Sequence, residues 1–386
     1  MPRPRYCRNP SCEYCHHPVP GFLIRNGTYT TQAHGRVQRY KCRRCGCGVS
    51  TQSESMYYYS KRRIDFGEVF SRIRGGSSQR DIARELGYSR TAVATAVARL
   101  ARQAMSAHLL VLCGLGQSRR VSFDGLVSAL TSRDYPTQIT VLADCQRELI
   151  LAMTHCVTER GGSRTESQKR RITAKRAVWR PKRGALGESI GLLVHELGRF
   201  VSPAGVHIDT DEHPLYARVI ATDLAMRWYR EAGLLSVRRT PGSAPRTPGN
   251  PLSLMNYLDR MIRHRMKEHT RESIAVGRNA TAQMQRMWLF AWDHNTRQPR
   301  RVGSTDQPSR AEAAGVSKLL LKRLRRQFTT RRCSLRGMMV PQSIRQVWTA
   351  ALDSPPVRWR SAQKTRGAPV PAFALRDLSF AYPHGQ

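Results

Sequence analysis

The cysteines near the N-terminus have the spacing of a metal site. Six of the ten cysteines lie in the first fifty residues, where they form the pairs Cys7-x4-Cys12 and Cys42-x2-Cys45. Four thiolates on two tight turns can surround zinc as a tetrahedron, which leaves no open position for catalysis. We therefore predict a structural zinc site formed by Cys7, Cys12, Cys42 and Cys45. Cys15 remains an alternative to Cys7, because it also forms a CxxC pair with Cys12.

Two strand-like segments end in carboxylates, the side chains that suit Mg²⁺ or Mn²⁺. The chain has 27 Asp and Glu against 65 Lys and Arg, so an acid at the end of a strand is informative. RRVSFDG places Asp124 near the end of a short apolar run, and AGVHIDTDEH places Asp209 and Asp211 at the end of another. We pair Asp124 with Asp211. We expect Asp144 and Asp209 to be turn residues, with Asp209 as the substitute for Asp211.

A third acid is expected on a later helix. The run LMNYLDRMIRHRMKEHTRESIAVGRN carries an apolar stripe at helical spacing, and its candidate acids are Asp259, Glu268 and Glu272. With roughly 100° per residue, a continuous helix would point Glu268 away from Asp259 and turn Glu272 by about 140°. Only one of the three can therefore join Asp124 and Asp211.

The elements that must position these acids form a mixed sheet. Residues 118–300 read as strand, strand, strand, helix, strand, helix, which predicts helices packed against the sheet, with a hairpin turn at Asp144–Arg147. The stretch 157–183 has ten Lys or Arg against two Glu, and it reads as a solvated loop or a DNA-backbone contact. The Pro/Gly-rich stretch 240–251 reads as a linker.

Residues 64–104 predict two short helices joined by Gly87-Tyr88-Ser89. A glycine-containing turn of this length is typical of a helix-turn-helix, whose second helix enters the major groove of DNA. The alternative is a helical hairpin that only packs on its neighbours. We expect five residues of the second helix to contact DNA, the first three through bases and the last two through phosphates: Arg90, Thr91, Thr95, Arg99 and Arg102.

The net charge of +38 points to a polyanionic partner. A soluble domain usually carries a net charge of magnitude about 2–8, so this chain would repel itself strongly without one. Nucleic acid is the first candidate. A hydrophobic fraction of 40% excludes wholesale disorder. No apolar run approaches the ~20 residues of a membrane span, and no secretory signal is visible, so we expect an intracellular protein.

The sequence thus predicts a multidomain α+β chain that binds nucleic acid. We expect four regions, in this order: a zinc ribbon over 1–55, a helix-turn-helix domain over 60–108, an α/β catalytic domain over 118–300, and a basic, partly helical C-terminal region over 301–386.

Two runs resemble the transposases of bacterial insertion sequences, in particular the family named insertion sequence one. They are TDEHPLY, with Asp211, and MIRHRMKEHTRESIAVGRN, with Arg263, Arg265 and Arg271 in fixed spacing. The match in order covers roughly residues 5–300. The resemblance implies a zinc ribbon and a helix-turn-helix joined to an RNase H-like domain with a DDE triad, in which Asp124 and Asp211 are the first two acids.

The third acid departs from the pattern of these transposases. They carry a Glu followed three residues later by Asn, whereas this chain has Asn256 followed three residues later by Asp259. Both lie on one helical face, so Asp259 takes the place of the acid. Glu272 and Glu268 remain alternatives.

The resemblance implies a transposase that uses Mg²⁺ or Mn²⁺ besides the structural Zn²⁺. Water would cut at the ends of the element, and the freed 3′-hydroxyl would then attack target DNA. The implied partner is double-stranded DNA, both terminal inverted repeats and target, contacted also by Arg263 and Arg271, with the protein acting as a homo-oligomer in the cytoplasm at the bacterial nucleoid. The competing interpretation is a non-catalytic zinc-ribbon/helix-turn-helix regulator derived from a transposase.

Overall fold

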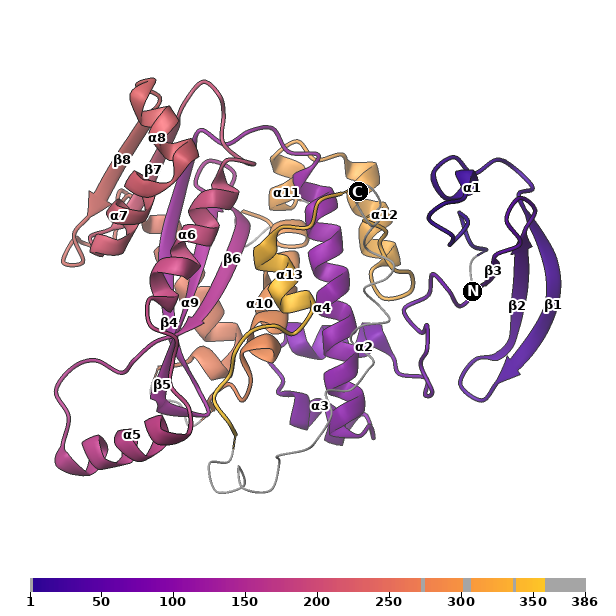
Figure 1. Ribbon diagram of the computed structural model, residues 1–386, viewed down its shortest axis with the longest axis horizontal. Helices are drawn as coiled ribbons and strands as arrows, with labels where there is room; N and C mark the ends of the chain where they lie inside the picture. The colour runs from indigo at the N-terminus through magenta and orange to yellow at the C-terminus, as the bar shows by residue number, and fades with distance from the viewer. Residues whose placement is uncertain (1–2, 272–274, 301–306, 336–337, 358–386) are drawn as a thin grey trace.

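The computed structural model describes residues 3–271, 275–300, 307–335 and 338–357, and it shows a mixed α+β fold (Figure 1). The N-terminal part is a three-stranded antiparallel sheet of order β1-β2-β3. Buried cysteines pack there with Phe22, Leu23, Tyr40 and Val49. The elements of this part are α1 (Glu13–His16), β1 (Leu23–Thr31), β2 (Gly35–Cys42) and β3 (Gly48–Ser50).

Three helices follow the small sheet: α2 (Phe66–Arg74), α3 (Gln79–Glu85) and α4 (Arg90–Leu112). The hydroxyls of Ser78 and Ser89 accept N–H bonds in the first turns of α3 and α4, which fixes where these helices begin. Gly87 takes a φ of +65° in the turn between them, a conformation that other residues rarely adopt. The two helices and the break that the sequence predicts are present.

The larger sheet has five strands in the order β6-β5-β4-β7-β8. β4, β5 and β6 pair antiparallel, whereas β7 runs parallel to β4 and β8 runs parallel to β7. The predicted mixed sheet and the hairpin after Asp144 are confirmed. The strands are β4 (Arg120–Leu130), β5 (Ser132–Asp144), β6 (Leu149–Val157), β7 (Val206–Asp211) and β8 (Leu235–Thr240).

Helices cover both faces of this sheet. Val121 and Phe123 of β4 pack with α6 (Ala185–Leu197), α7 (Pro214–Thr222) and α8 (Leu224–Glu231). Leu126, on the other face of β4, packs in a second core. This second core also contains residues of α4, α9 (Ser253–Arg265), α10 (Ala280–Thr296) and α13 (Gln342–Trp348).

A third core joins regions that the sequence analysis separates. Residues of α2, α3 and α4 pack with Trp292 of α10 and with the helices α11 (Arg310–Ala313) and α12 (Lys318–Gln327). Trp292 is fully buried and stacks on Phe328 with ring centroids 5.1 Å apart. The expected helix-turn-helix domain (60–108), catalytic domain (118–300) and C-terminal region (301–386) therefore share this core and do not have separate ones.

Two segments expected to lack regular structure differ in outcome. The predicted loop at 157–183 contains a helix, α5 (Glu166–Val178), which begins with a capping box between Thr165 and Gln168. The stretch 240–251 is irregular between the end of β8 and the start of α9, as a linker should be.

The long helix expected around Asp259 ends at Arg265, and a short 3-10 turn, η1 (Lys267–His269), follows it. In the described part of the chain, no helix has the length and apolar character needed to cross a bilayer.

Candidate functional site

Four of the N-terminal cysteines converge. The Sγ atoms of Cys7, Cys12, Cys42 and Cys45 all lie within 4.8 Å of one another. Two of the separations are 3.3 Å, between Cys7 and Cys45, and 3.9 Å, between Cys12 and Cys42. Cys15 is buried outside this group, so the geometry favours Cys7 over Cys15.

The cysteine group fits a tetrahedral zinc ion. Zn–S bonds of about 2.3 Å place tetrahedral sulfurs about 3.8 Å apart, close to the observed separations. Burial raises the pKa of the Cys7 and Cys12 thiols. Burial acts in the same direction on Cys45, but hydrogen bonds from the Cys47 N–H and from the neighbouring thiols lower its pKa to about 7. A thiol that ionises near neutral pH can bind a metal readily. All four ligand positions are filled by protein, so such an ion would have a structural role.

The second candidate site is formed by carboxylates at the centre of the larger sheet. On the parallel strands β4 and β7, Ser122 lies opposite Asp209. Because side chains alternate along a strand, Asp124 and Asp211, two residues further on, lie level on the same face. Neighbouring strands are about 4.8 Å apart, so these two carboxylates are neighbours. Leu126 belongs to the core beneath α9 and α10, so this is the face that α9 covers.

Asp259 approaches this pair from α9. Leu258 and Ile262 are buried against the sheet and hold the helix over it. Burial, with the negative charges of Asp211 and Asp259, raises the pKa of the Asp124 carboxyl to about 6, although the Gly125 N–H bond opposes the shift. The three acids are therefore close enough to affect one another.

The carboxylates do not converge as tightly as the thiolates do. Among the described residues, the cysteines are the group of three or more potential ligands that could hold one ion in the present conformation. Asp259 instead forms an ion pair with Arg263, one turn along α9, at 3.0 Å. Arg263 also donates to the carbonyls of His269 and Val127. A donor set made only of carboxylates suits Mg²⁺ or Mn²⁺, but Asp259 must leave Arg263 to bind such an ion.

The structure places the alternative acids elsewhere. Glu268 lies in η1 and forms a largely buried ion pair with Arg286 at 2.8 Å. Because α9 ends before Glu268, the angular relation predicted from a continuous helix does not apply to it. Glu272 lies outside the described residues.

Asp209 was predicted to be a turn residue, and this is wrong. It lies within β7, is fully buried, and forms ion pairs with Arg120 and Arg238, each at 2.7 Å. Burial would raise its pKa, but these two guanidinium groups and His207 lower it. A carboxylate held this way is already neutralised and is a poor metal ligand. Asp144 is the last residue of β5, and its carboxylate accepts bonds from the N–H groups of Gln146 and Arg147 in the turn that follows.

Two residues near the carboxylates were not predicted as parts of the site. Tyr216 of α7 is buried, and burial together with the charges of Asp124 and Asp211 raises its pKa well above the usual value. Arg246 is exposed in the linker after β8, yet its charge lowers the pKa of Asp124. A Pro/Gly-rich linker gives no sequence signal that one of its arginines will reach the acids.

The residues expected to contact DNA fall into two groups. Arg90, Thr91 and Thr95 are exposed on the first turns of α4, and Arg271 is exposed after η1. In contrast, Arg99 donates to the carbonyls of Met56 and Tyr58, at 2.8 and 2.6 Å. Arg99 thus fastens α4 to the segment that leaves the small sheet. Arg102 is half-buried, and Arg263 is engaged with Asp259.

Comparison with known proteins does not establish a family. No family model matches the sequence, and no curated protein matches it. Among solved structures, one match is a chain of the cryoEM structure of the simian T-cell lymphotropic virus intasome in complex with PP2A regulatory subunit B56 gamma. The TM-score is 0.26 and the identity 11%, over 53% of this chain and 57% of that chain. A TM-score this low does not establish a shared fold.

The cysteine geometry predicts one tightly bound zinc ion per chain. Cys42→Ser removes one of the four thiolates and should lose the zinc, whereas Cys15→Ser should keep it, because Cys15 lies outside the group. Zinc released from purified protein can be measured with a chromogenic chelator. Equal zinc loss in the two variants would show that the ligand set is wrong.

The raised pKa of Asp124 predicts a pH-dependent stability. An acid with a pKa of about 6 in the folded protein and about 3.9 in the unfolded chain binds its proton more tightly when folded, so its contribution is lost as pH rises through 6. Asp124→Asn removes the charge. It should raise the free energy of unfolding by about 1–3 kcal/mol at about pH 8, and by much less at about pH 4.5.

Urea unfolding in magnesium-free buffer measures this difference, and Glu231→Gln, an exposed acid on α8, is the control. Added Mg²⁺ or Mn²⁺ should raise the Tm of the wild-type protein at pH 8 and leave that of Asp124→Asn unchanged. A stability gain that is the same at both pH values would contradict the assignment.

Proposed function

We propose that the protein is a DNA transposase. Its RNase H-like domain would cut and join DNA strands using Asp124, Asp211 and Asp259, while the zinc ribbon and the helix-turn-helix bind terminal inverted repeats. The observation that carries the proposal is the level placement of Asp124 and Asp211 on adjacent parallel strands, with Asp259 close enough to raise the pKa of Asp124. The net charge of +38 supports DNA as the substrate.

The three carboxylates and the arginines near them suit the cleavage and transfer of phosphodiester bonds. Asp124, Asp211 and Asp259 would hold divalent ions, which would polarise the attacking oxygen and stabilise the leaving oxygen. Asp124 and Asp211 sit on rigid strands and would hold fixed positions. Asp259 would exchange Arg263 for metal, which frees a guanidinium group beside the site. Arg246 is exposed and near Asp124, and it would bind the phosphate next to the scissile one.

The helices after the small sheet support the proposed DNA-binding role. α4 presents Arg90, Thr91 and Thr95 at its exposed N-terminal end, as a recognition helix would. The bonds from Arg99 to the Met56 and Tyr58 carbonyls fasten α4 to the segment that follows the small sheet. Both modules would then engage one stretch of DNA together. This arrangement supports recognition of a terminal repeat by two linked contacts.

The second candidate function is a DNA-binding regulator without catalytic activity. The ion pair between Asp259 and Arg263 favours it, because an acid neutralised within its own helix needs no metal. The order of Asn256 and Asp259, reversed from that of the resembling transposases, points the same way. The regulator would share the small sheet and α2–α4, so DNA binding alone does not separate the two functions.

Cleavage of a labelled element end separates them. Purified protein with Mg²⁺ or Mn²⁺ should nick or join this DNA, and Asp124→Ala and Asp211→Ala should each lower the rate at least about a hundredfold, because a metal ligand is lost. Asp259→Ala should cause a similar loss. All three variants should still bind the end, since their contacts to DNA lie elsewhere.

Glu231→Gln again serves as the matched control, because this acid is exposed on α8. If the wild-type protein binds ends but cuts none with either metal, the regulator is correct. If it cuts and Asp259→Ala cuts equally well, the triad is incorrectly assigned.

A further inference from the structure

We propose that residues 158–184, here called the arm, form a second contact to duplex DNA that grips phosphates regardless of base sequence. The arm leaves β6, forms α5 and returns to α6, and α5 stands away from the sheet at one end of the molecule (Figure 1). It carries ten Lys or Arg and two Glu. The inference rests on the proposed function for the identity of the polymer, and on the arm itself for the contact.

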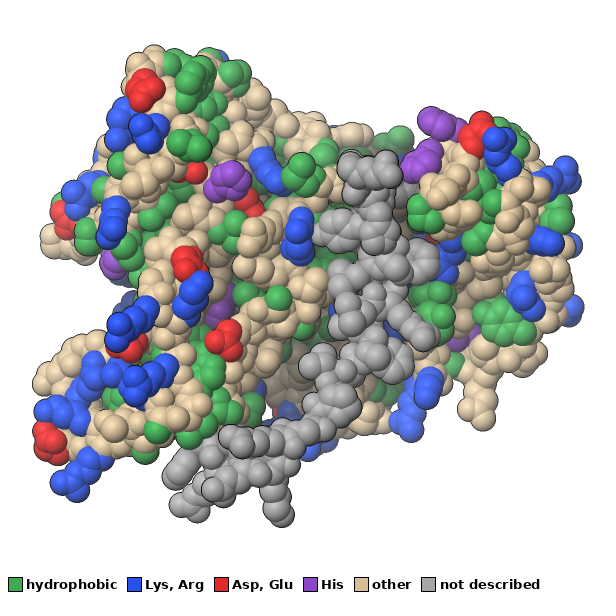
Figure 2. Space-filling model, in the orientation of Figure 1, with side chains coloured by type: hydrophobic (Ala, Val, Ile, Leu, Met, Phe, Trp, Pro, Cys, Tyr) green, Lys and Arg blue, Asp and Glu red, His purple; other side chains and the backbone are tan. Residues whose placement is uncertain are grey.

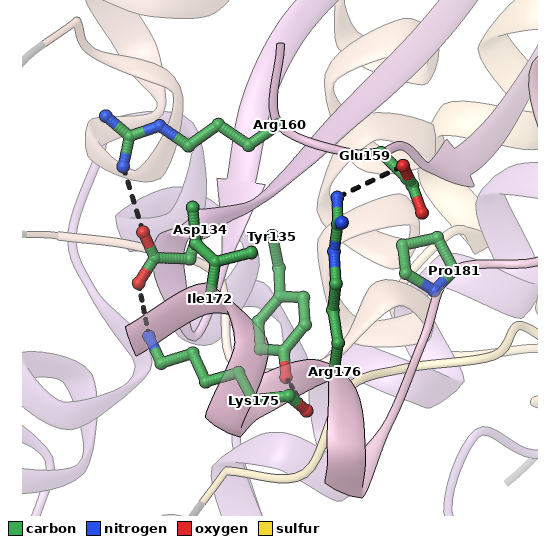
Figure 3. Close-up of a pocket in the computed structure, with 8 residues that line it drawn as sticks. All are labelled: Asp134, Tyr135, Glu159, Arg160, Ile172, Lys175, Arg176 and Pro181. Atoms are coloured by element: carbon green, nitrogen blue, oxygen red, sulfur yellow. Dashed lines mark hydrogen bonds and ion pairs between the residues drawn. The ribbon is translucent and has the colours of Figure 1, made fainter. Parts of the chain in front are cut away.

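The arm is held in place by a buried acid at its root. Asp134 of β5, whose side chain is 2% exposed, forms ion pairs with Arg160, Arg171 and Lys175 at 2.9, 2.8 and 2.6 Å. Burial would raise the pKa of Asp134, but these three cations hold it well below its usual range. Figure 3 shows Asp134 between Arg160 and Lys175. This charge cluster fixes the start of the arm and the middle of α5 to the sheet.

Packing at the root adds to this attachment. Ile172 is the one buried residue of α5. The Tyr135 hydroxyl donates to the Lys175 carbonyl (Figure 3). The ring of Tyr135 packs edge-on against that of Trp179, with ring centroids 5.4 Å apart. The cavity between these residues is about 10 Å³, room for about one water molecule. The contacts at the base of the arm therefore fix its orientation relative to β5, and the cavity between them has no space for a small ligand.

The outer surface of the arm keeps cations that the protein itself does not neutralise. Three of the ten lysines and arginines bind Asp134, and Lys169, Arg176 and Lys182 pair with glutamates. Arg170, Arg180 and Arg183 are exposed and have no ion pair among the described residues. Blue side chains gather over α5 in Figure 2. Arg170 is two residues from Ile172, roughly 200° around the helix, so it points away from the root.

The position of the arm fits a duplex that also reaches the carboxylates. The arm is anchored at the tip of the β4–β5 hairpin, where Ala129 pairs with Pro136. Ala129 is five residues beyond Asp124 along β4, a distance of about 17 Å at ~3.3 Å per residue. This equals about five base pairs at 3.4 Å each. DNA bound at the acids and continuing along β4 would therefore bring its phosphates to the arm.

The surface chemistry favours backbone contact over base reading. Arg170 lies on α5, whose other exposed residues include Thr173, Ala174 and Ala177, and Arg180 and Arg183 follow the helix. Arginines in such surroundings can approach phosphates closely, and the small side chains beside them offer few groups that distinguish bases. Each phosphate neutralised by a cation releases counterions, so such a contact should appear as salt dependence.

The test replaces the three exposed cations together in the full-length, zinc-loaded protein. Arg170→Gln/Arg180→Gln/Arg183→Gln should bind duplex DNA more weakly, by about 10- to 100-fold at low salt. The slope of log K against log[KCl] between about 50 and 200 mM should fall by about 2–3, close to 0.9 for each lost phosphate contact. Fluorescence anisotropy measures both, and the loss should be equal for an element end and for a duplex of unrelated sequence.

The matched control removes the same charge from another surface. Arg218, Arg227 and Arg230 are exposed on α7 and α8, beside the opposite edge of the sheet, and their triple change to Gln alters net charge equally. If the two triple variants share one slope, the arm makes no contact and the inference falls. It also falls if the arm variant loses affinity for RNA or single-stranded DNA but not for duplex.

Failure of the arm and failure of the proposed function are distinguishable. A wild-type protein that never cuts DNA, together with an arm variant of reduced slope, refutes the transposase and keeps the arm contact. A wild-type protein that cuts DNA, together with an arm variant that binds like the control variant, supports the transposase and refutes the arm contact.

Discussion

The parallel pairing of β4 with β7 is the constraint on which the candidate site depends. Paired residues of these strands, such as Ser122 and Asp209, are 87 positions apart in the chain. Two residues beyond this pair, Asp124 and Asp211 lie level on one face. Two carboxylates at this spacing, partly buried, repel each other and favour a proton or a metal cation between them. Burial is the main cause of the raised pKa of Asp124, and the negative charges of Asp211 and Asp259 add to it. The proposed chemistry uses the repulsion as the driving force for metal binding.

Three other buried acids differ because basic side chains already neutralise them. Asp209 pairs with Arg120 and Arg238, and Asp134 is surrounded by three cations of the arm. Asp293 of α10 pairs with Arg74 of α2 and Arg265 of α9, and so ties these helices together. In a chain this basic, an acid that is not paired with arginine in the interior is the exception. Asp124 and Asp211 form no ion pair among the described residues, whereas Asp259 pairs with Arg263 and must leave it to bind a metal ion.

Sequence analysis predicted the features that depend on neighbours in the chain. The cysteine pairs, the turn between α3 and α4, the hairpin after Asp144 and the strand before Asp211 all follow from short patterns. The arm shows where such patterns fail. α5 buries one residue, so it has no apolar period from which a helix could be predicted.

Features that depend on distant residues could not be predicted. The burial of Asp209 is compensated by Arg238, which comes from a strand that pairs only after the chain has passed two helices. The core shared by α4, α10 and α12 likewise joins segments about two hundred residues apart. Arg99 was assigned to phosphate from its place on a helix, but the carbonyls of Met56 and Tyr58 already occupy it. Helical spacing gives the face of a side chain, not its partner.

The most direct test of the account is the position of Mn²⁺ in a crystal of the wild-type protein with bound DNA. Anomalous diffraction should show two ions about 3.5–4 Å apart, bound by Asp124, Asp211 and Asp259, with Arg263 turned away from Asp259. An absence of ions at these acids, with the Asp259–Arg263 pair intact, would contradict the assignment of a metal-dependent site.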